Sequence, residues 1–356
     1  MSESLAFKPN FEEAKKHWEA FWNQEALDRP CTAITCHRTG APPARPLPYM
    51  SGHDGNFGPV IEAVLHNAET TWWGGDAMPH YTPSFGPDQF AAWLGADLEW
   101  SKDSQSTNWV VPFVEDWKKA LPLRLDAQNK WWTRMLDFVA ALGKAAAGKM
   151  LIAHLDLHSN MDALSAIRTP SRLCMDLYDV PELIDRAMAD VRAMYPAVYD
   201  AVYEAGGMAR HGTCGWVPAY HHGKTNTIQC DFAALCGPEH FRRWILPALD
   251  EEAAFLEHCV YHYDGPECLV HLDDICSIKG LDAIQWTPGA RNKSFIEWMD
   301  LLKEIQSKGK GVYVPCNTTD IKTYHKELKP NMVFYICSAR NEEEAQRTLD
   351  WLVENT

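Results

Sequence analysis

The chain has 356 residues, of which 46% are hydrophobic and 23% charged, and its formal net charge is −15. These fractions are typical of a globular protein and allow one large α/β domain or two ordinary ones. The negative charge argues against nucleic acid as a partner, because nucleic-acid binding requires a clustered basic face. The sequence contains neither a signal peptide nor an apolar run of the ~20 residues that span a bilayer. We therefore expect a cytoplasmic protein without a membrane partner.

Predicted strands and helices alternate along the chain. An amphipathic helix is expected at residues 10–28, with four large apolar side chains on one side: Phe11, Trp18, Phe21 and Trp22. Strands are expected at residues 31–37, 70–77, 149–158, 207–214, 258–264, 281–286, 311–316 and 332–337. Further helices are expected at residues 59–68, 127–147, 180–204, 238–257, 292–308 and 341–354.

Repeated strand–helix alternation in a chain of this length favours a single (β/α)8 domain, a TIM barrel, over residues 1–356. Within it, residues 1–30 are an N-terminal helical extension and residues 78–126 a long insertion after the second strand. A doubly wound open sheet is the alternative fold. It is disfavoured because no glycine-rich phosphate-binding loop follows the first predicted strand.

Polar side chains gather at the ends of the predicted strands, where parallel barrels carry their functional residues. The third strand ends in His154-Leu-Asp156-Leu-His158, an alternation that places three polar side chains on one face of a strand. We interpret four residues of this kind as substrate-orienting or acid–base groups: Asp76, His154, Asp156 and His222. A structural carboxylate–imidazole network is an equally good interpretation of the alternating segment.

Residues able to bind a metal end two other predicted strands. The fifth strand ends in His262-Tyr-Asp264, and two residues so spaced point to the same face of a strand. The last strand ends in Cys337. Imidazole, carboxylate and thiolate are usual zinc ligands, and three protein ligands leave one position open for substrate. The pattern predicts a zinc site formed by His262, Asp264 and Cys337, which Cys316 could join or merely pack against.

A longer segment contains an Asp-Phe pair, a Pro-Glu-x-Phe motif and a proline after an apolar run, at Asp231-Phe, Pro238-Glu-His-Phe241 and Pro247. Further motifs follow as His262 with Gly265, Gly280-Leu-Asp-Ala-Ile-Gln-Trp286, Pro315-Cys-Asn317 and Cys337. Together they resemble the uroporphyrinogen decarboxylase superfamily over roughly residues 70–354. The resemblance implies a (β/α)8 barrel.

The superfamily has two well-known activities. Its decarboxylases hold an acidic tetrapyrrole through an arginine-rich N-terminal segment and an aspartate that aligns with Asp76. The corresponding segment here, from His37 to Arg45, lacks closely spaced arginines, so this activity is disfavoured. The second activity belongs to zinc-dependent methyltransferases that work with corrinoid proteins. Their zinc is held by a His-x-Cys pair on the fifth strand and a cysteine on the eighth.

His262 and Cys337 match that zinc pattern, whereas Asp264 stands where those enzymes have a second cysteine. The resemblance implies a zinc enzyme that activates a thiol or another group of a small-molecule substrate, with any corrinoid carried by a partner protein. Asp264 would make the ion harder than a cysteine would. That change, with the tryptophan-rich insertion, keeps open a metal-assisted lyase or hydrolase, either decarboxylase-like or acting on a carbohydrate or aromatic substrate. A non-catalytic binding protein is the remaining alternative.

Overall fold

The computed structural model describes residues 4–99, 108–289 and 293–356. Its main feature is a seven-stranded sheet in the order β2-β1-β13-β12-β11-β10-β9. The strands are β1 (Cys31–His37), β2 (Thr71–Gly75), β9 (Thr225–Gln229), β10 (His258–Asp264), β11 (Ala283–Thr287), β12 (Gly311–Asn317) and β13 (Val333–Ser338). All neighbours pair in parallel except β2, which is antiparallel to β1.

The other strands in the described ranges are short and lie outside this sheet. They form three pairs: β3 (His80–Tyr81) with β6 (Leu151–Ile152), β4 (Leu98–Glu99) with β5 (Trp109–Val110), and β7 (Thr213–Cys214) with β8 (Tyr220–His221). Single backbone hydrogen bonds link these pieces, from Asp76 N to Thr32 O at 2.8 Å and from His154 N to Cys214 O at 2.7 Å. The described residues thus form a mostly parallel α/β sheet, without a continuous ladder that closes it.

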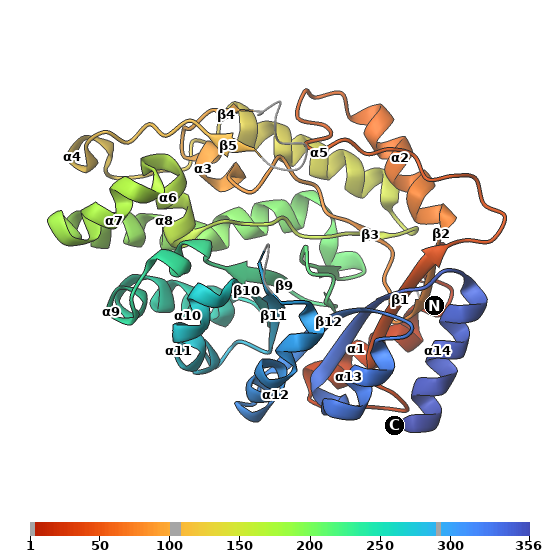
Figure 1. Cartoon of the computed structure of the whole chain (residues 1–356). Helices are drawn as coiled ribbons and strands as arrows, with labels where there is room; N and C mark the ends of the chain where they lie inside the picture. Colours follow the sequence, from red (N-terminus) through yellow and green to blue (C-terminus); the bar gives the residue numbers. More distant parts are fainter. Residues whose placement is uncertain (1–3, 100–107, 290–292) are drawn as a thin grey trace.

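Helices surround the sheet (Figure 1). They are α1 (Phe11–Trp22), α2 (Phe57–Thr70), α3 (Gln89–Trp93), α4 (Trp117–Ala120), α5 (Lys130–Ala146), α6 (Asn160–Arg168), α7 (Pro170–Asp179), α8 (Pro181–Ala205), α9 (Pro238–His240), α10 (Leu246–Phe255), α11 (Leu272–Cys276), α12 (Met299–Ser307), α13 (Ile321–Glu327) and α14 (Glu342–Asn355). Figure 1 shows α14 beside β1 and β2, so the last helix packs against the first two strands of the sheet. No helix in the described ranges is long and apolar enough to cross a membrane.

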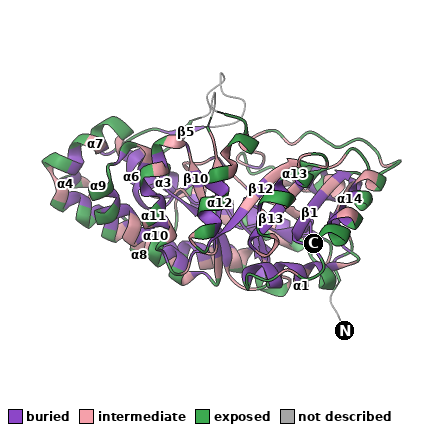
Figure 2. Cartoon of the chain, turned by 60° about the horizontal axis from the view of Figure 1, so that its bottom comes forward, coloured by how far each residue is buried: buried purple, intermediate pink, exposed green. Residues whose placement is uncertain are grey.

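Helix α1 covers the N-terminal ends of the parallel strands. Its apolar side packs in one cluster with Val260, Ala283 and Phe334, which are early residues of β10, β11 and β13. The indole N–H groups of Trp18 and Trp22 each donate to a backbone carbonyl at 2.8 Å, which satisfies their only polar atoms inside the core. Most residues of β1, β9, β10, β11 and β13 are buried (Figure 2). The N-terminal side of the sheet is therefore closed.

Several local predictions differ from the structure. The second predicted strand is β2, and it is antiparallel rather than parallel to β1. Within residues 207–214 only Thr213–Cys214 is a strand, preceded by a short helix at Met208–Arg210. Strand β9 was missed because its sequence Thr-Asn-Thr-Ile-Gln is polar, although all five residues are buried. The predicted insertion at 78–126 includes β3, which pairs with β6, and its residues 100–107 lie outside the described ranges.

Candidate functional site

Three side chains that can bind a metal meet at the C-terminal ends of two adjacent strands. His262 and Asp264 come from the end of β10, and Asp231 begins the short helix η2 (Asp231–Leu235) just after β9. One ligand atom from each of Asp231, His262 and Asp264 lies within 4.8 Å of the others. His262 Nε2 is 3.8 Å from Asp231 Oδ1. We call these three residues the metal-ligand group.

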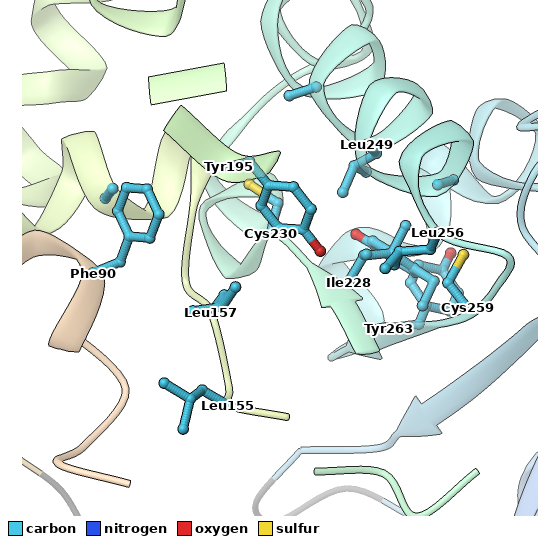
Figure 3. Close-up of a cluster of buried hydrophobic side chains, with 14 of the residues drawn as sticks. Phe90, Leu155, Leu157, Tyr195, Ile228, Cys230, Leu249, Leu256, Cys259 and Tyr263 are labelled. Atoms are coloured by element: carbon cyan, nitrogen blue, oxygen red, sulfur yellow. The ribbon is translucent and has the colours of Figure 1, made fainter. Parts of the chain in front are cut away.

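The alternation of β10 explains why two of these side chains share a face. Cys259, Tyr261 and Tyr263 are at most 1% exposed and point into the core. Figure 3 shows Cys259 and Tyr263 among the buried apolar side chains. His262 and Asp264, at the intervening positions, are only partly buried. The sequence pattern of β10 thus places an imidazole and a carboxylate together on the opposite face.

Neighbouring side chains on β11 fix the orientation of the His262 ring. His262 Nδ1 hydrogen-bonds with Gln285 Oε1, and Gln285 Nε2 donates to Thr287 Oγ1 at 2.9 Å. Because the Gln285 oxygen can only accept, Nδ1 is the donor in this hydrogen bond and Nε2 is the ring nitrogen left to bind a metal. Metal-binding histidines commonly have such a partner on the second ring nitrogen. Trp216 further restrains the ring through an edge contact with a centroid distance of 4.9 Å.

Electrostatics at this group favour a bound cation. Burial raises the pKa of Asp264, and the nearby carboxylates of Asp231 and Glu267 raise it further. Two aspartates held close together at neutral pH repel each other unless a positive charge lies between them. A divalent ion would supply that charge and stabilise both ionised carboxylates. The donor set of one imidazole and two carboxylates therefore fits a divalent metal.

A cavity of about 460 Å³ adjoins the metal-ligand group and shares Asp231 with it. Its polar lining includes His158, Asp162 and Asp88. Its apolar lining comes from Phe232 and other side chains of η2, β5 and α6. A small molecule in this cavity would lie next to an ion bound at Asp231.

His158 is a titratable side chain of this cavity. Its Nε2 lies 3.3 Å from Asp156 Oδ2, and its Nδ1 lies 3.7 Å from Asp162 Oδ2. Burial lowers the pKa of His158, but the carboxylates of Asp156 and Asp162 outweigh burial and raise it to about 10. The amide nitrogen Nε2 of Gln229 also lies 2.6 Å from His158 Nε2, so three side chains hold the ring in place. The structure brings Asp156 and His158 of the predicted alternating segment together beside the cavity.

His154, the first residue of that segment, points elsewhere. Strand β6 ends at Ile152, so the strict alternation expected through His158 does not hold. The His154 ring is fully buried, stacks on Tyr199 at 3.9 Å and has Nε2 3.2 Å from Tyr199 O. Burial lowers the pKa of His154 to about 4, so the ring is neutral. These contacts correct the prediction that His154 orients a substrate, because it has no access to the cavity.

Asp76 and His222 lie at the opposite end of the sheet from the metal-ligand group. Asp76 is fully buried and accepts hydrogen bonds from Arg29 Nη2 at 3.0 Å and from Thr32 N at 2.7 Å. Thr32 is the second residue of β1, at its N-terminal end. His222 follows β8 and lines a separate small cavity beside α1 with Trp22. The structure therefore does not bring either residue into the site predicted for it.

Cys337 lies three strands from His262, on β13, and is not a member of the metal-ligand group. Its neighbour in the ladder is Cys316 on β12. Each cysteine is the next-to-last residue of its strand, and His262 likewise lies near the C-terminal end of β10. This geometry gives no support to the prediction that Cys337 is a third ligand with His262 and Asp264.

Two residues of the site, Asp231 and Asp162, were not singled out as functional from the sequence. Asp231 belongs to the Asp-Phe pair of the resemblance, which was the only signal for it. The Asp162 carboxylate accepts hydrogen bonds from the backbone N–H groups of Asp231 at 2.9 Å and Phe232 at 2.8 Å. Burial raises the pKa of Asp162 to about 6. Asp162 thus anchors the backbone that carries Asp231.

The start of α6 is anchored in turn by a buried glutamate. Glu252 Oε1 accepts hydrogen bonds from Ser159 Oγ at 2.6 Å and Asn160 Nδ2 at 3.1 Å. Asn160 has a φ of +51°, a left-handed conformation that costs free energy for a residue other than glycine. Its side-chain amide also donates to Gln229 O at 3.0 Å. These contacts link Glu252 to the end of β9.

Replacing Glu252 by glutamine is expected to change how stability depends on pH. Burial raises the pKa of Glu252 from 4.5 to about 7. Between these values the folded chain binds more protons than the unfolded chain, so the free energy of unfolding falls as pH rises. The fall is up to roughly 1.4 kcal/mol per pH unit. Glu252→Gln should remove this component in urea denaturation at about pH 5 and about pH 7.5.

The matched control is Glu251→Gln. Glu251 is the preceding residue, pairs with Arg192 at 2.8 Å on the surface and has a lowered pKa. We expect no change in the pH dependence over the same range for this variant. An unchanged pH slope in Glu252→Gln would show that Glu252 is not protonated in the folded chain.

Among the comparisons with known proteins, only the comparison with solved structures finds a match. No protein-family model and no curated protein matches the sequence. Among solved structures, a methyltransferase from Methanosarcina mazei aligns over 96% of this chain and 98% of that chain, with a TM-score of 0.61 and 14% sequence identity. At this identity the likeness shows a shared fold.

Proposed function

We propose that this chain is a metal-dependent enzyme of the methyltransferase type, in which Asp231, His262 and Asp264 hold a divalent ion, most simply zinc. The observation that carries the proposal is the convergence of these three ligand atoms within 4.8 Å beside a cavity. Bonds of about 2.0–2.2 Å to zinc bring ligand atoms to roughly 3.3 Å from one another. Small side-chain rotations would therefore complete the site and leave a coordination position for substrate.

We propose further that the whole chain is one (β/α)8 barrel domain. Strands β1 and β9–β13 supply most of its wall, and β3, β6 and β7 lie between the ends of this sheet. The solved methyltransferase with a TM-score of 0.61 covers nearly the whole chain, which supports a single domain. In such a barrel the metal-ligand group lies at the C-terminal ends of the strands, the usual place for an active site.

The chemistry follows from the ion and from the residues around it. When bound, a divalent ion supplies Lewis acidity that lowers the pKa of a coordinated thiol or hydroxyl group. Gln285 keeps His262 Nε2 available as a ligand, and Asp162 fixes the backbone of Asp231. The carboxylates of Asp156 and Asp162 raise the pKa of His158, so this ring can hold a proton at the cavity and exchange it with a bound molecule.

Methyl transfer is proposed on the sequence motifs, which resemble the corrinoid-linked methyltransferases. A solved methyltransferase that shares the fold is consistent with this proposal. We propose that the corrinoid is carried by a partner protein that approaches the cavity mouth. Trp109 and Leu235, two lining residues of this cavity, are 56% and 57% exposed. Exposed apolar side chains at the edge of a site suit contact with a partner.

A metal-assisted lyase or hydrolase is the second candidate. The specific observation in its favour is the donor set, since Asp231 and Asp264 supply oxygen where a thiol-activating zinc is usually held by sulfur. Oxygen ligands leave the ion harder and more electrophilic. Such an ion would polarise a hydroxyl, carbonyl or carboxylate group of a substrate.

Metal analysis followed by a methyl-transfer assay tests these proposals. Protein purified without chelator should carry about one divalent ion per chain. Loaded chain should then transfer a methyl group from free methylcobalamin to a small thiol, and His262→Ala should abolish the transfer. Bound metal without transfer would favour the lyase or hydrolase. A chain with neither bound metal nor an effect of His262→Ala would be a non-catalytic binding protein.

A further inference from the structure

The cavity beside the metal-ligand group has an excess of negative charge. Asp88, Asp162 and Asp231 line it, and its lining within the described ranges contains no lysine or arginine. Asp156 and Asp264 lie directly behind two of the lining groups. His158 is the one side chain in the described lining that can carry a positive charge, whereas five carboxyl groups lie at the cavity or next to its lining. Acidic groups therefore outnumber basic groups at this cavity.

The rest of the cavity is apolar and far larger than an inorganic ion needs. Phe232, Leu235 and Val110 contribute side chains, and three prolines add rigid apolar surface. Trp109 stands at the edge with 56% of its surface exposed. A volume of about 460 Å³ would hold an organic molecule of several heavy atoms. Aromatic side chains next to carboxylates are the usual recognition elements for alkylated ammonium groups.

The position of Asp88 strengthens the preference for a cation. Asp88 is partly buried, and its Oδ2 accepts a hydrogen bond from Val110 N at 3.3 Å, next to Trp109 in the chain. Burial raises the pKa of the Asp88 carboxyl group, so this carboxylate is less stable as an anion than it is in water. A positive ligand group nearby would stabilise its ionised form, whereas a carboxylate or phosphate group on the ligand would be repelled.

We propose that this cavity binds a small organic cation, an amine or alkylammonium compound, whose charged group lies between Asp88 and Trp109. The inference names the substrate class of the metal site, and so it rests on the function proposed above. In this arrangement the cation is held by the carboxylates and the indole. Another group of the same molecule can then reach the ion at Asp231.

Isothermal titration of the full chain tests the inference with two pairs of probes. Each pair joins a cation to a neutral analogue: choline with 3,3-dimethylbutan-1-ol, and n-butylammonium with n-butanol. We expect at least one cation to bind at least about tenfold more tightly than its neutral analogue. Asp88→Asn should weaken that binding by about tenfold, and Trp109→Ala should weaken it severalfold. Glu115→Gln, an exposed carboxylate paired with Arg172 outside the cavity, should leave it unchanged.

Equal affinity for both members of each pair, no binding of either cation, or an unchanged affinity in Asp88→Asn would overturn the inference. The titrations are run on chain stripped of metal and on chain loaded with zinc, which separates two kinds of failure. Cation binding to a chain that takes up no metal would support the cavity assignment and contradict the proposed metal site. Metal binding without cation selectivity would support the proposed metal site and contradict the cavity assignment.

Discussion

His262→Ala is expected to lower the affinity for a divalent ion at least about 100-fold and to leave the purified chain nearly free of metal. His262 supplies the only nitrogen of the metal-ligand group, and the two remaining aspartates form an incomplete site. Asp231→Asn should have a comparable though smaller effect, because it removes a charged ligand but keeps an oxygen. The readouts are elemental analysis and competition with a chromophoric chelator.

Two further variants make this result specific. His222→Ala, at the opposite end of the sheet, should leave metal binding unchanged. Cys337→Ser should also retain the ion, because Cys337 lies outside the metal-ligand group. Loss of metal in Cys337→Ser together with retention in Asp231→Asn would contradict the proposed ligand set. That outcome would favour the His262, Asp264 and Cys337 site predicted from the sequence.

Asp76→Ala is expected to lower the free energy of unfolding by about 3–5 kcal/mol. Asp76 is fully buried and pairs with Arg29, which is also buried. The buried ammonium of Lys8 lies nearby, and its pKa is lowered to about 8 because burial outweighs the attraction of Asp76. Removing the carboxylate leaves two buried cations without their counter-charge. Denaturation by urea should show the loss directly.

Asp28→Ala is the matched control for this variant. Asp28 is 57% exposed and contacts His17, a neighbour of Asp76, at 3.4 Å. Its replacement should cost under about 1 kcal/mol. In both variants the metal affinity of the folded chain should equal that of the parent. If Asp76→Ala kept full stability and lost metal or substrate binding, Asp76 would belong to the active site after all.

Strand β10 shows how far sequence periodicity can reach. Its bounds, His258–Asp264, coincide with the prediction, because buried and partly buried residues alternate through its second half. The same periodicity placed His262 and Asp264 together, and the structure has both in the metal-ligand group. For these two residues the alternation within a single strand is enough to predict that their side chains lie together.

Other parts of the site depend on contacts between distant segments. Strand β9 is polar in sequence, and its burial results from partners on β10 and on the loop before α6. Asp231 follows this strand, so its place in the metal-ligand group could not be predicted until the strand was known. The prediction for His154 differs from the structure for a similar reason. Strand β6 ends at Ile152, and the His154 ring stacks on the ring of Tyr199 from α8.

Cys337 illustrates a further limit. Its strand and its position at the C-terminal end were predicted correctly from the sequence. The distance between β13 and β10 across the sheet depends on the intervening strands β11 and β12 and on the curvature of the sheet. Neither the order of the strands nor the curvature of the sheet can be predicted from the sequence of a single strand. A resemblance to another family can suggest a ligand at such a position, but only the assembled fold decides whether it lies near the others.

Zinc K-edge X-ray absorption on the metal-loaded chain tests the central claim most directly, because it separates light ligands from sulfur by distance. The account predicts a first shell made only of nitrogen and oxygen at about 2.0–2.2 Å, contributed by His262, Asp231, Asp264 and a solvent or substrate atom. This shell should be lost in His262→Ala. A sulfur scatterer at about 2.3 Å that disappears in Cys337→Ser, or a chain that binds no zinc, would contradict it.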